Sequence, residues 1–155
     1  MAEIEVGQKA PAFALTLGNG ENWRSADHAG KALVVYFYPK DDTSGCTAQA
    51  IDFSRLRPDF EAAGAELIGI SPDSVKSHAK FAEKHGLDLS LGADEERQAI
   101  EAFGVWSEKS MYGKKYMGVD RSTFLIAGNG EIARVWRKVK VPGHAEEVLA
   151  ALKAL

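Results

Sequence analysis

The longest unbroken apolar segment in the chain is residues 32–38, which read Ala-Leu-Val-Val-Tyr-Phe-Tyr. A run this rich in β-branched and aromatic side chains predicts a strand covered on both faces, as in the middle of a parallel or mixed sheet. A second buried strand is predicted over residues 65–70. The remaining predicted strands are shorter: an edge strand over 13–17, a strand over 87–91, and a hairpin of 122–127 and 131–137 around Gly128-Asn129-Gly130.

Between the strands, apolar residues recur at three- and four-residue spacing, which predicts helices. The first helix is expected to begin at about Cys46, after Pro39 has ended the strand, and to end at Gly64. Its expected inward residues are Ala50, Phe53, Leu56, Phe60 and Ala63. A second helix is expected to begin after Ser71-Pro72-Asp73-Ser74 and to end at Gly86, with Val75, Ala79 and Ala82 facing inward. The last two are expected over 94–103 and after Pro142-Gly143, the final one burying Val148, Leu149, Leu152 and Leu155.

The order of these elements predicts the fold class. A strand–helix–strand unit gives a parallel pair, and the later hairpin adds antiparallel strands. We therefore expect an α/β protein with a thioredoxin-like fold, in which a mixed central sheet carries helices on both faces. No repeat or Pro/Ser-rich linker divides the sequence, so residues 1–155 are expected to form a single domain.

Composition and charge narrow the function classes. The 155 residues are 45% hydrophobic and 26% charged, which is typical of a globular protein. A formal net charge of −3 gives no general attraction to nucleic acid or to anionic membranes. The chain has no apolar run long enough to span a membrane, and no signal peptide is expected. With one cysteine the fold needs no oxidising compartment, so we expect a cytoplasmic location.

That cysteine, Cys46, is the first candidate for chemistry. A lone cysteine is most often a small buried hydrophobe. Cys46, however, is predicted at the start of a helix, where unpaired backbone N–H groups stabilise an anion such as a thiolate. Its neighbours Ser44, Gly45 and Thr47 are small or polar, so the sulfur is expected to be approachable.

The segment from Pro39 to Cys46 resembles the active-site signature of peroxiredoxins, Pro-x-x-x-Thr-x-x-Cys, with Thr43 at the threonine position. The run from Tyr36 to Thr47 and later segments through Ile126 resemble the peroxiredoxin Q, or bacterioferritin comigratory protein, subfamily over nearly the whole chain. The resemblance implies a thioredoxin-like fold and a thiol-dependent peroxidase that acts on hydrogen peroxide and organic hydroperoxides. It implies a cysteine sulfenic acid intermediate and no cofactor or metal.

The resemblance also implies roles for single residues. Cys46 would be the attacking thiolate, and Thr43, Arg121 and the backbone N–H groups of Cys46 and Gly45 would face the peroxide oxygens. Arg121 matches the family's arginine at the start of a late strand. Pro39 would shield the sulfur from water, or would simply end the strand. Gln49, three residues after Cys46, would either hold the arginine or be an exposed helix residue.

The chain departs from much of this subfamily in lacking a second cysteine. Ile51 and Ala82 stand at the two positions where other members carry one, and both are expected to be core-facing or neutral helix residues. The oxidised Cys46 must therefore be reduced by an external thiol, either glutathione or a glutaredoxin, thioredoxin, or Cys46 of a second subunit. An engineered loss of a resolving cysteine would look the same. The protein is expected to be a monomer or a weak homodimer.

Three other interpretations are less consistent with the sequence. His78 and His85 are seven residues apart on one predicted helix, too far to share a metal ion, and are expected to be solvated. A redox sensor would need a reactive thiol but not Thr43 and Arg121 together. A non-catalytic thioredoxin-like binding module would not need the proline–threonine–cysteine spacing at all.

Overall fold

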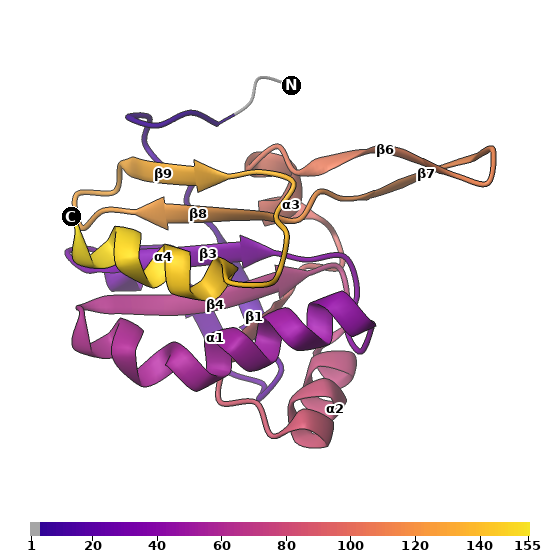
Figure 1. Ribbon diagram of the computed structural model, residues 1–155, viewed down its shortest axis with the longest axis horizontal. Coiled ribbons are helices and arrows are strands. Elements are labelled where there is room, and N and C mark those ends of the chain that lie inside the picture. The colour runs from indigo at the N-terminus through magenta and orange to yellow at the C-terminus, as the bar shows by residue number, and fades with distance from the viewer. Residues whose placement is uncertain (1–3) are drawn as a thin grey trace.

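The computed structural model describes residues 4–155 and is built on one seven-stranded mixed sheet, in the order β2-β1-β5-β4-β3-β8-β9 (Figure 1). Its strands are β1 (Ala14–Leu17), β2 (Asn22–Arg24), β3 (Ala32–Phe37), β4 (Ala65–Ser71), β5 (Ser90–Ala93), β8 (Ser122–Ile126) and β9 (Ile132–Trp136). Its helices are the 3-10 helix η1 (Ser25–His28), α1 (Ser44–Ala62), α2 (Val75–His85), α3 (Gln98–Ala102) and α4 (His144–Lys153). Strands β6 (Trp106–Met111) and β7 (Lys114–Val119) form a separate hairpin.

The predicted central strand, β3, divides the interior into two cores. It runs parallel to β4 and antiparallel to β8, and five of its six residues are buried. Because side chains alternate along a strand, Val34 and Tyr36 enter one core while Val35 and Phe37 enter the other. The expected mixed sheet is thereby confirmed.

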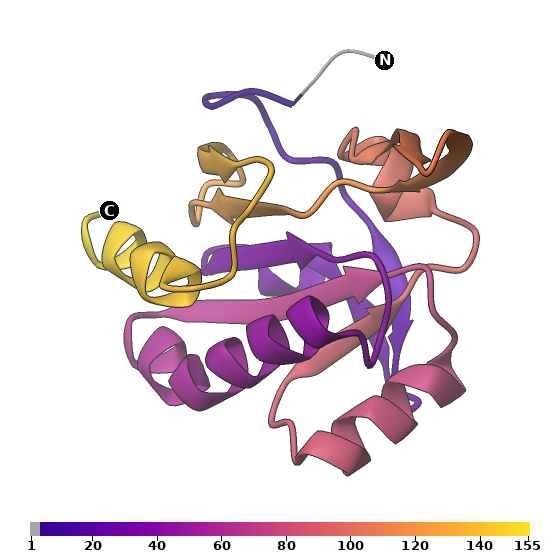
Figure 2. The ribbon, with the colours of Figure 1, turned by 45° about the vertical axis from the view of Figure 1, so that its right-hand side comes forward.

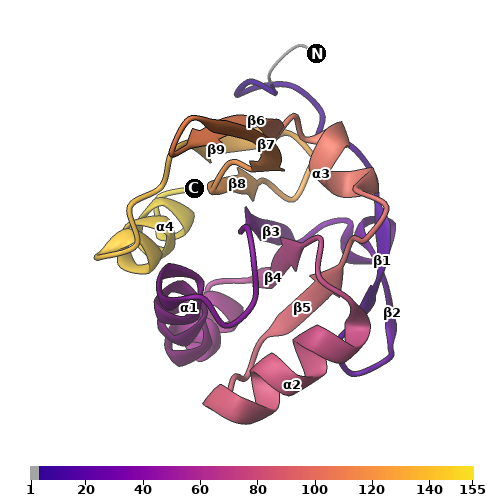
Figure 3. The same ribbon diagram turned by 90° about the vertical axis from the view of Figure 1, so that its right-hand side faces the viewer.

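Helices cover both faces of this sheet (Figures 2 and 3). Buried residues of α1, α2 and α4 pack with Val34 and Tyr36 on one face. On the other face, α3 packs with β1, with Trp23 of β2 and with the inward residues of β8. The first core therefore surrounds the start of α1, where the candidate cysteine lies.

Several helix ends follow the predicted signals. The Ser74 hydroxyl accepts a hydrogen bond from the Ser77 backbone N–H at 3.0 Å and caps α2. Gly86, at φ +60°, ends that helix in the left-handed conformation. Helix α1 begins at Ser44 rather than at Cys46, with Thr43 as its N-cap residue. Across residues 4–155 no helix is both long and apolar enough to cross a bilayer.

Other boundaries differ from the predictions. Strand β1 is not an edge strand, because the three-residue β2 pairs outside it. The fifth strand lies at 90–93 rather than 87–91. Helix α3 spans 98–102 only, because the buried Asp94 carboxylate caps it by accepting from the backbone N–H groups of Gln98 and Ile100.

Some residues that were predicted to face inward are not buried. Ala63 lies beyond the end of α1 and is exposed, as is Leu155 beyond α4. On α2 the buried residues are His78 and Phe81, whereas Ala79 is exposed and Val75 and Ala82 are only half-buried. His78, expected in solvent, is fully buried because polar partners surround its ring.

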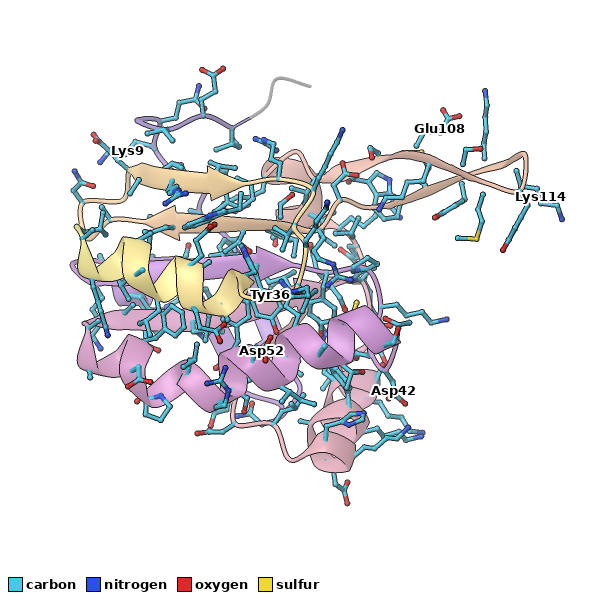
Figure 4. All side chains as sticks on the ribbon, in the orientation of Figure 1. Lys9, Tyr36, Asp42, Asp52, Glu108 and Lys114 are labelled. Atoms are coloured by element: carbon cyan, nitrogen blue, oxygen red, sulfur yellow. The ribbon has the colours of Figure 1, made fainter. Side chains whose placement is uncertain are left out.

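The β6–β7 hairpin was not predicted. Its residues are mostly polar and exposed, so they give no buried strand pattern. The hairpin projects from the domain, with Glu108 and Lys114 along it (Figures 1 and 4). Its tight turn has Tyr112 and Gly113 both at positive φ, the geometry of a type I′ turn.

A close approach between Tyr36 and Gly69 joins β3 to β4. The two residues are register partners, and a methyl group added at Gly69 would lie 2.5 Å from Tyr36 Cζ. Only glycine leaves room for the phenol ring at this position.

We therefore expect Gly69→Ala to lower the free energy of unfolding by about 1–3 kcal/mol, because the added methyl overpacks the core. Urea unfolding measures the loss. The double variant Gly69→Ala/Tyr36→Leu should lose less than the sum of the two single variants, since the smaller side chain makes room for the methyl. Strict additivity would contradict this account.

Candidate active site

Cys46 is the third residue of α1, directly below the loop that leaves β3. The first helical turn around it has backbone N–H groups with no partner within the helix, which favour a negative charge. Its side chain belongs to the apolar cluster of Tyr36, Ala50 and Phe53 and is only 2% exposed. The expectation of an approachable sulfur is thus wrong for this conformation, because side chains distant in sequence cover it.

Arg121 lies immediately before β8, and its side chain reaches the cysteine at the start of α1. Since β8 pairs with β3, the start of β8 lies beside the end of β3 and the loop into α1. Arg121 Nη2 donates a hydrogen bond to Cys46 Sγ at 3.2 Å, and Nη1 donates to Gln49 Oε1 at 2.5 Å. A side chain at Gly45 would place its Cβ 3.3 Å from Nη2, so glycine at this position leaves space for the guanidinium.

The structure therefore brings Cys46, Gly45, Gln49 and Arg121 together. Gln49 is 1% exposed, so it is not an exposed helix residue. Its side-chain oxygen accepts from the arginine and holds one arm of the guanidinium fork in place.

Pro39 and Thr43 lie at the two ends of the loop above the cysteine. Pro39 follows the buried Tyr38 and is half-buried. The Thr43 hydroxyl donates to the Lys40 carbonyl at 2.8 Å, which leaves its oxygen lone pairs available as acceptors. Thr43 itself is exposed, so it lies at the solvent side of the site.

Tyr36 forms the inner wall of the site. Its ring stacks on Phe53 with centroids 4.5 Å apart (Figure 4 shows Tyr36 between the sheet and α1). Within residues 4–155, neither its hydroxyl nor Gln49 Nε2 has a hydrogen-bond partner. Burial raises the pKa of the Tyr36 phenol well above its usual value, and negative charge on Cys46 raises this pKa further.

Two residues near the site were missed from the sequence. Asp41, in the middle of the loop between Pro39 and Thr43, is buried and lies 2.7 Å from the ring of His78. The spacing of His78 could have indicated that it faces inward, because it lies three residues from both Val75 and Phe81 on one face of the helix. No group of three or more His, Cys, Asp and Glu side chains in the described part of the chain could hold a metal ion.

Known proteins are similar to this chain over most of its length. The AhpC/TSA family matches residues 6–135. Peroxiredoxin Bcp of Bacillus subtilis is 49% identical over 150 residues, covering 97% of this chain and 96% of the relative.

Solved structures are similar over the same length. A cysteine-to-serine mutant of Xylella fastidiosa PrxQ superposes with a TM-score of 0.94 at 40% identity, covering 99% of this chain and 98% of the other. A Xanthomonas campestris bacterioferritin comigratory protein, described for its alkyl peroxide reduction activity, has a TM-score of 0.89 at 47% identity, with the same coverage. The expected thioredoxin-like architecture is confirmed.

The raised pKa values predict a titration behaviour. Burial is the main cause that lifts the pKa of both Tyr36 and Tyr38. Both phenols should stay protonated in the folded protein around pH 10, where a solvated tyrosine ionises. Stability should therefore be unaffected by these groups below about pH 10 and should fall above it, as only the unfolded chain releases their protons.

Absorbance at 295 nm during alkaline titration measures the ionisation of the tyrosine phenols. Until unfolding begins, the Tyr36→Phe/Tyr38→Phe double variant should show the same increase in absorbance as the wild type. A smaller increase in the double variant would mean that these phenols ionise in the folded state.

Proposed function

The chain belongs to the AhpC/TSA family and is a thiol-dependent peroxidase, and we propose that its reaction runs through Cys46 as the attacking thiolate. The observation that carries this assignment is the 3.2 Å hydrogen bond from Arg121 to the Cys46 sulfur. A guanidinium is permanently charged, so this contact places a fixed positive charge beside the attacking sulfur. The first turn of α1 acts in the same direction.

The first step is a nucleophilic displacement on oxygen. The Cys46 sulfur attacks the terminal oxygen of a hydroperoxide, forming an S–O bond while the O–O bond breaks. Sulfur is oxidised to sulfenic acid, and the peroxide is reduced to an alkoxide or hydroxide that takes up a proton. Negative charge moves from sulfur to the departing oxygen during this step.

The residues around Cys46 suit that movement of charge. Arg121 directs its Nη2 donor at the sulfur and stays charged throughout. The Thr43 hydroxyl, with its proton on the Lys40 carbonyl, accepts a hydrogen bond from the peroxide O–H. The backbone N–H groups of Gly45 and Cys46 face the peroxide oxygens, and Pro39 limits access of water to the sulfur.

Gln49 is a positioning residue in this scheme. Its bond to Arg121 Nη1 leaves Nη2 for the sulfur. Because both Cys46 and Gln49 are on α1, one turn apart, a single helix sets the geometry of the two contacts.

The substrates are hydrogen peroxide and organic hydroperoxides. The similarity to the Xanthomonas campestris protein with alkyl peroxide reduction activity supports the organic class. The exposed position of Thr43 at the rim supports a site in which the reacting O–OH group enters while the remainder of the substrate stays outside.

Recovery of the sulfenic acid uses a thiol from outside the chain, because the sequence holds no second cysteine. Glutathione or a glutaredoxin, thioredoxin, and Cys46 of a second copy remain the candidate donors. Ile51, at one of the two alternative cysteine positions, is 44% exposed and not core-facing, and Ala82 is half-buried. We further propose that residues 1–155 act as one domain, as a monomer or weak homodimer in the cytoplasm, where disulfides are not needed for the fold.

Replacing the nucleophile tests the assignment. In Cys46→Ser, consumption of hydrogen peroxide with dithiothreitol as the donor should fall to the rate without enzyme, because serine cannot form a sulfenic acid. Circular dichroism should show an unchanged fold, since oxygen for sulfur is a small change. Turnover equal to wild type would refute the role of Cys46.

Replacing the groups that face the peroxide tests their roles. Arg121→Ala and Thr43→Val should each lower the second-order rate constant of Cys46 oxidation by about 10²–10³-fold, as expected for loss of a fixed transition-state contact. Stopped-flow tryptophan fluorescence at varied peroxide concentration gives this constant. Arg134→Ala is the matched control, because Arg134 is exposed on β9 and contacts Trp136. Wild-type rates in the two site variants would remove them from the mechanism.

A further inference from the structure

A buried polar cluster fastens the loop above Cys46 to helix α2. Asp41 is 7% exposed, and its side chain turns away from solvent. Its Oδ1 accepts a hydrogen bond from the Tyr38 hydroxyl at 2.6 Å, and its Oδ2 accepts one from the Ser77 hydroxyl at 2.8 Å. A buried carboxylate needs such donors, so Asp41 is committed to this position.

His78 is the centre of the cluster. Its ring is fully buried, with Nε2 2.9 Å from the Gly92 carbonyl oxygen and Nδ1 2.7 Å from Asp41 Oδ2. A carbonyl oxygen only accepts, so Nε2 carries a proton. The 2.7 Å contact between Nδ1 and Oδ2 is a hydrogen bond and therefore also requires one proton, which the two side chains share. His78 is therefore held at both ring nitrogens, by Asp41 of the loop and by the Gly92 carbonyl of β5.

The loop backbone depends on this attachment. The Asp41 N–H donates to Asp73 Oδ2 at 2.8 Å, so side chain and main chain are both held. The next residue, Asp42, is in the left-handed conformation at φ +60°, which aspartate adopts more readily than most residues that carry a side chain. Its carboxylate binds Lys84 and His85 on the exposed side of α2, where ion pairs contribute little (Figure 4 labels Asp42 where the loop meets α2).

We infer that His78 is a positioning residue for the peroxidase reaction, acting through Asp41 on the loop that carries Thr43. Asp41 is two residues before Thr43, and the Thr43 hydroxyl is bonded back to Lys40. A shift at Asp41 therefore moves the threonine relative to the sulfur, whereas the sulfur is held separately by Arg121, which Gln49 positions. This inference rests on the proposed role of Thr43 in the reaction.

The test compares two reactions of the same sulfur. Peroxide needs the positioned Thr43, whereas iodoacetamide needs only an accessible thiolate. In His78→Leu, the ratio of the peroxide rate constant to the alkylation rate constant should fall by about 10- to 100-fold, as expected when a reacting group is misplaced by around 1 Å. His78→Asn places an amide donor near the position of Nδ1 and should restore most of this loss.

A matched control separates positioning from stability. Asp94→Asn weakens another buried polar contact, the cap of α3 on the opposite face of the sheet, and should leave the ratio unchanged. If His78→Leu does not fold, Ser77→Ala removes the other α2 donor to Asp41 without emptying the core and should lower the ratio several-fold.

A wild-type ratio in folded His78→Leu, or in Ser77→Ala where His78→Leu does not fold, would overturn the inference. The proposed function would then still stand, provided that Cys46→Ser has lost turnover. Peroxide turnover persisting in Cys46→Ser would instead overturn the proposed function itself.

Discussion

The hydrogen bond between the Arg121 guanidinium and the Cys46 sulfur is the contact on which the geometry of the site depends. The two residues are 75 positions apart in the chain, and they meet because β8 pairs with β3 in the sheet. The bond also places a fixed positive charge against a sulfur that is otherwise surrounded by apolar side chains. Without that charge, a thiolate in such surroundings would be strongly disfavoured by desolvation. The pairing of β8 with β3 therefore also determines the charge next to the thiol, and with it the reactivity of the thiol.

Local sequence signals were sufficient for much of the site. Pro39, Thr43 and Cys46 belong to one short segment, and the apolar run before it shows where the strand ends. Arg121 could be identified because it matches the family's arginine at the start of a late strand. The helix caps at Ser74 and Gly86 are likewise decided within a few residues, and such local features are the ones that sequence patterns predict well.

Features decided by distant contacts could not be predicted in this way. Flanking residues suggested an open Cys46, but Tyr36, Phe53 and Arg121 bury it. Histidine is a polar residue that is usually found at the surface. His78 can be buried because Asp41, from another segment of the chain, forms a hydrogen bond with its ring. The β6–β7 hairpin has no core to form a pattern, and Asp94 shortens α3 by bonding to backbone groups as far as six residues away. For Cys46 and His78, the partner that decides the outcome is not visible in the local pattern.

The exposed Ile51 has a consequence for how the catalytic cycle is supplied. A cysteine on the same chain presents its thiol at a millimolar or higher effective concentration, independent of conditions outside the protein. With isoleucine at that position and no other cysteine, the lifetime of the oxidised sulfur is set by the concentration of the external thiol. A sulfenic acid that waits is open to attack by a second peroxide, which gives the sulfinic acid. The burial of Cys46 then also slows this second attack. It protects the sulfenic acid until the reducing thiol arrives by diffusion.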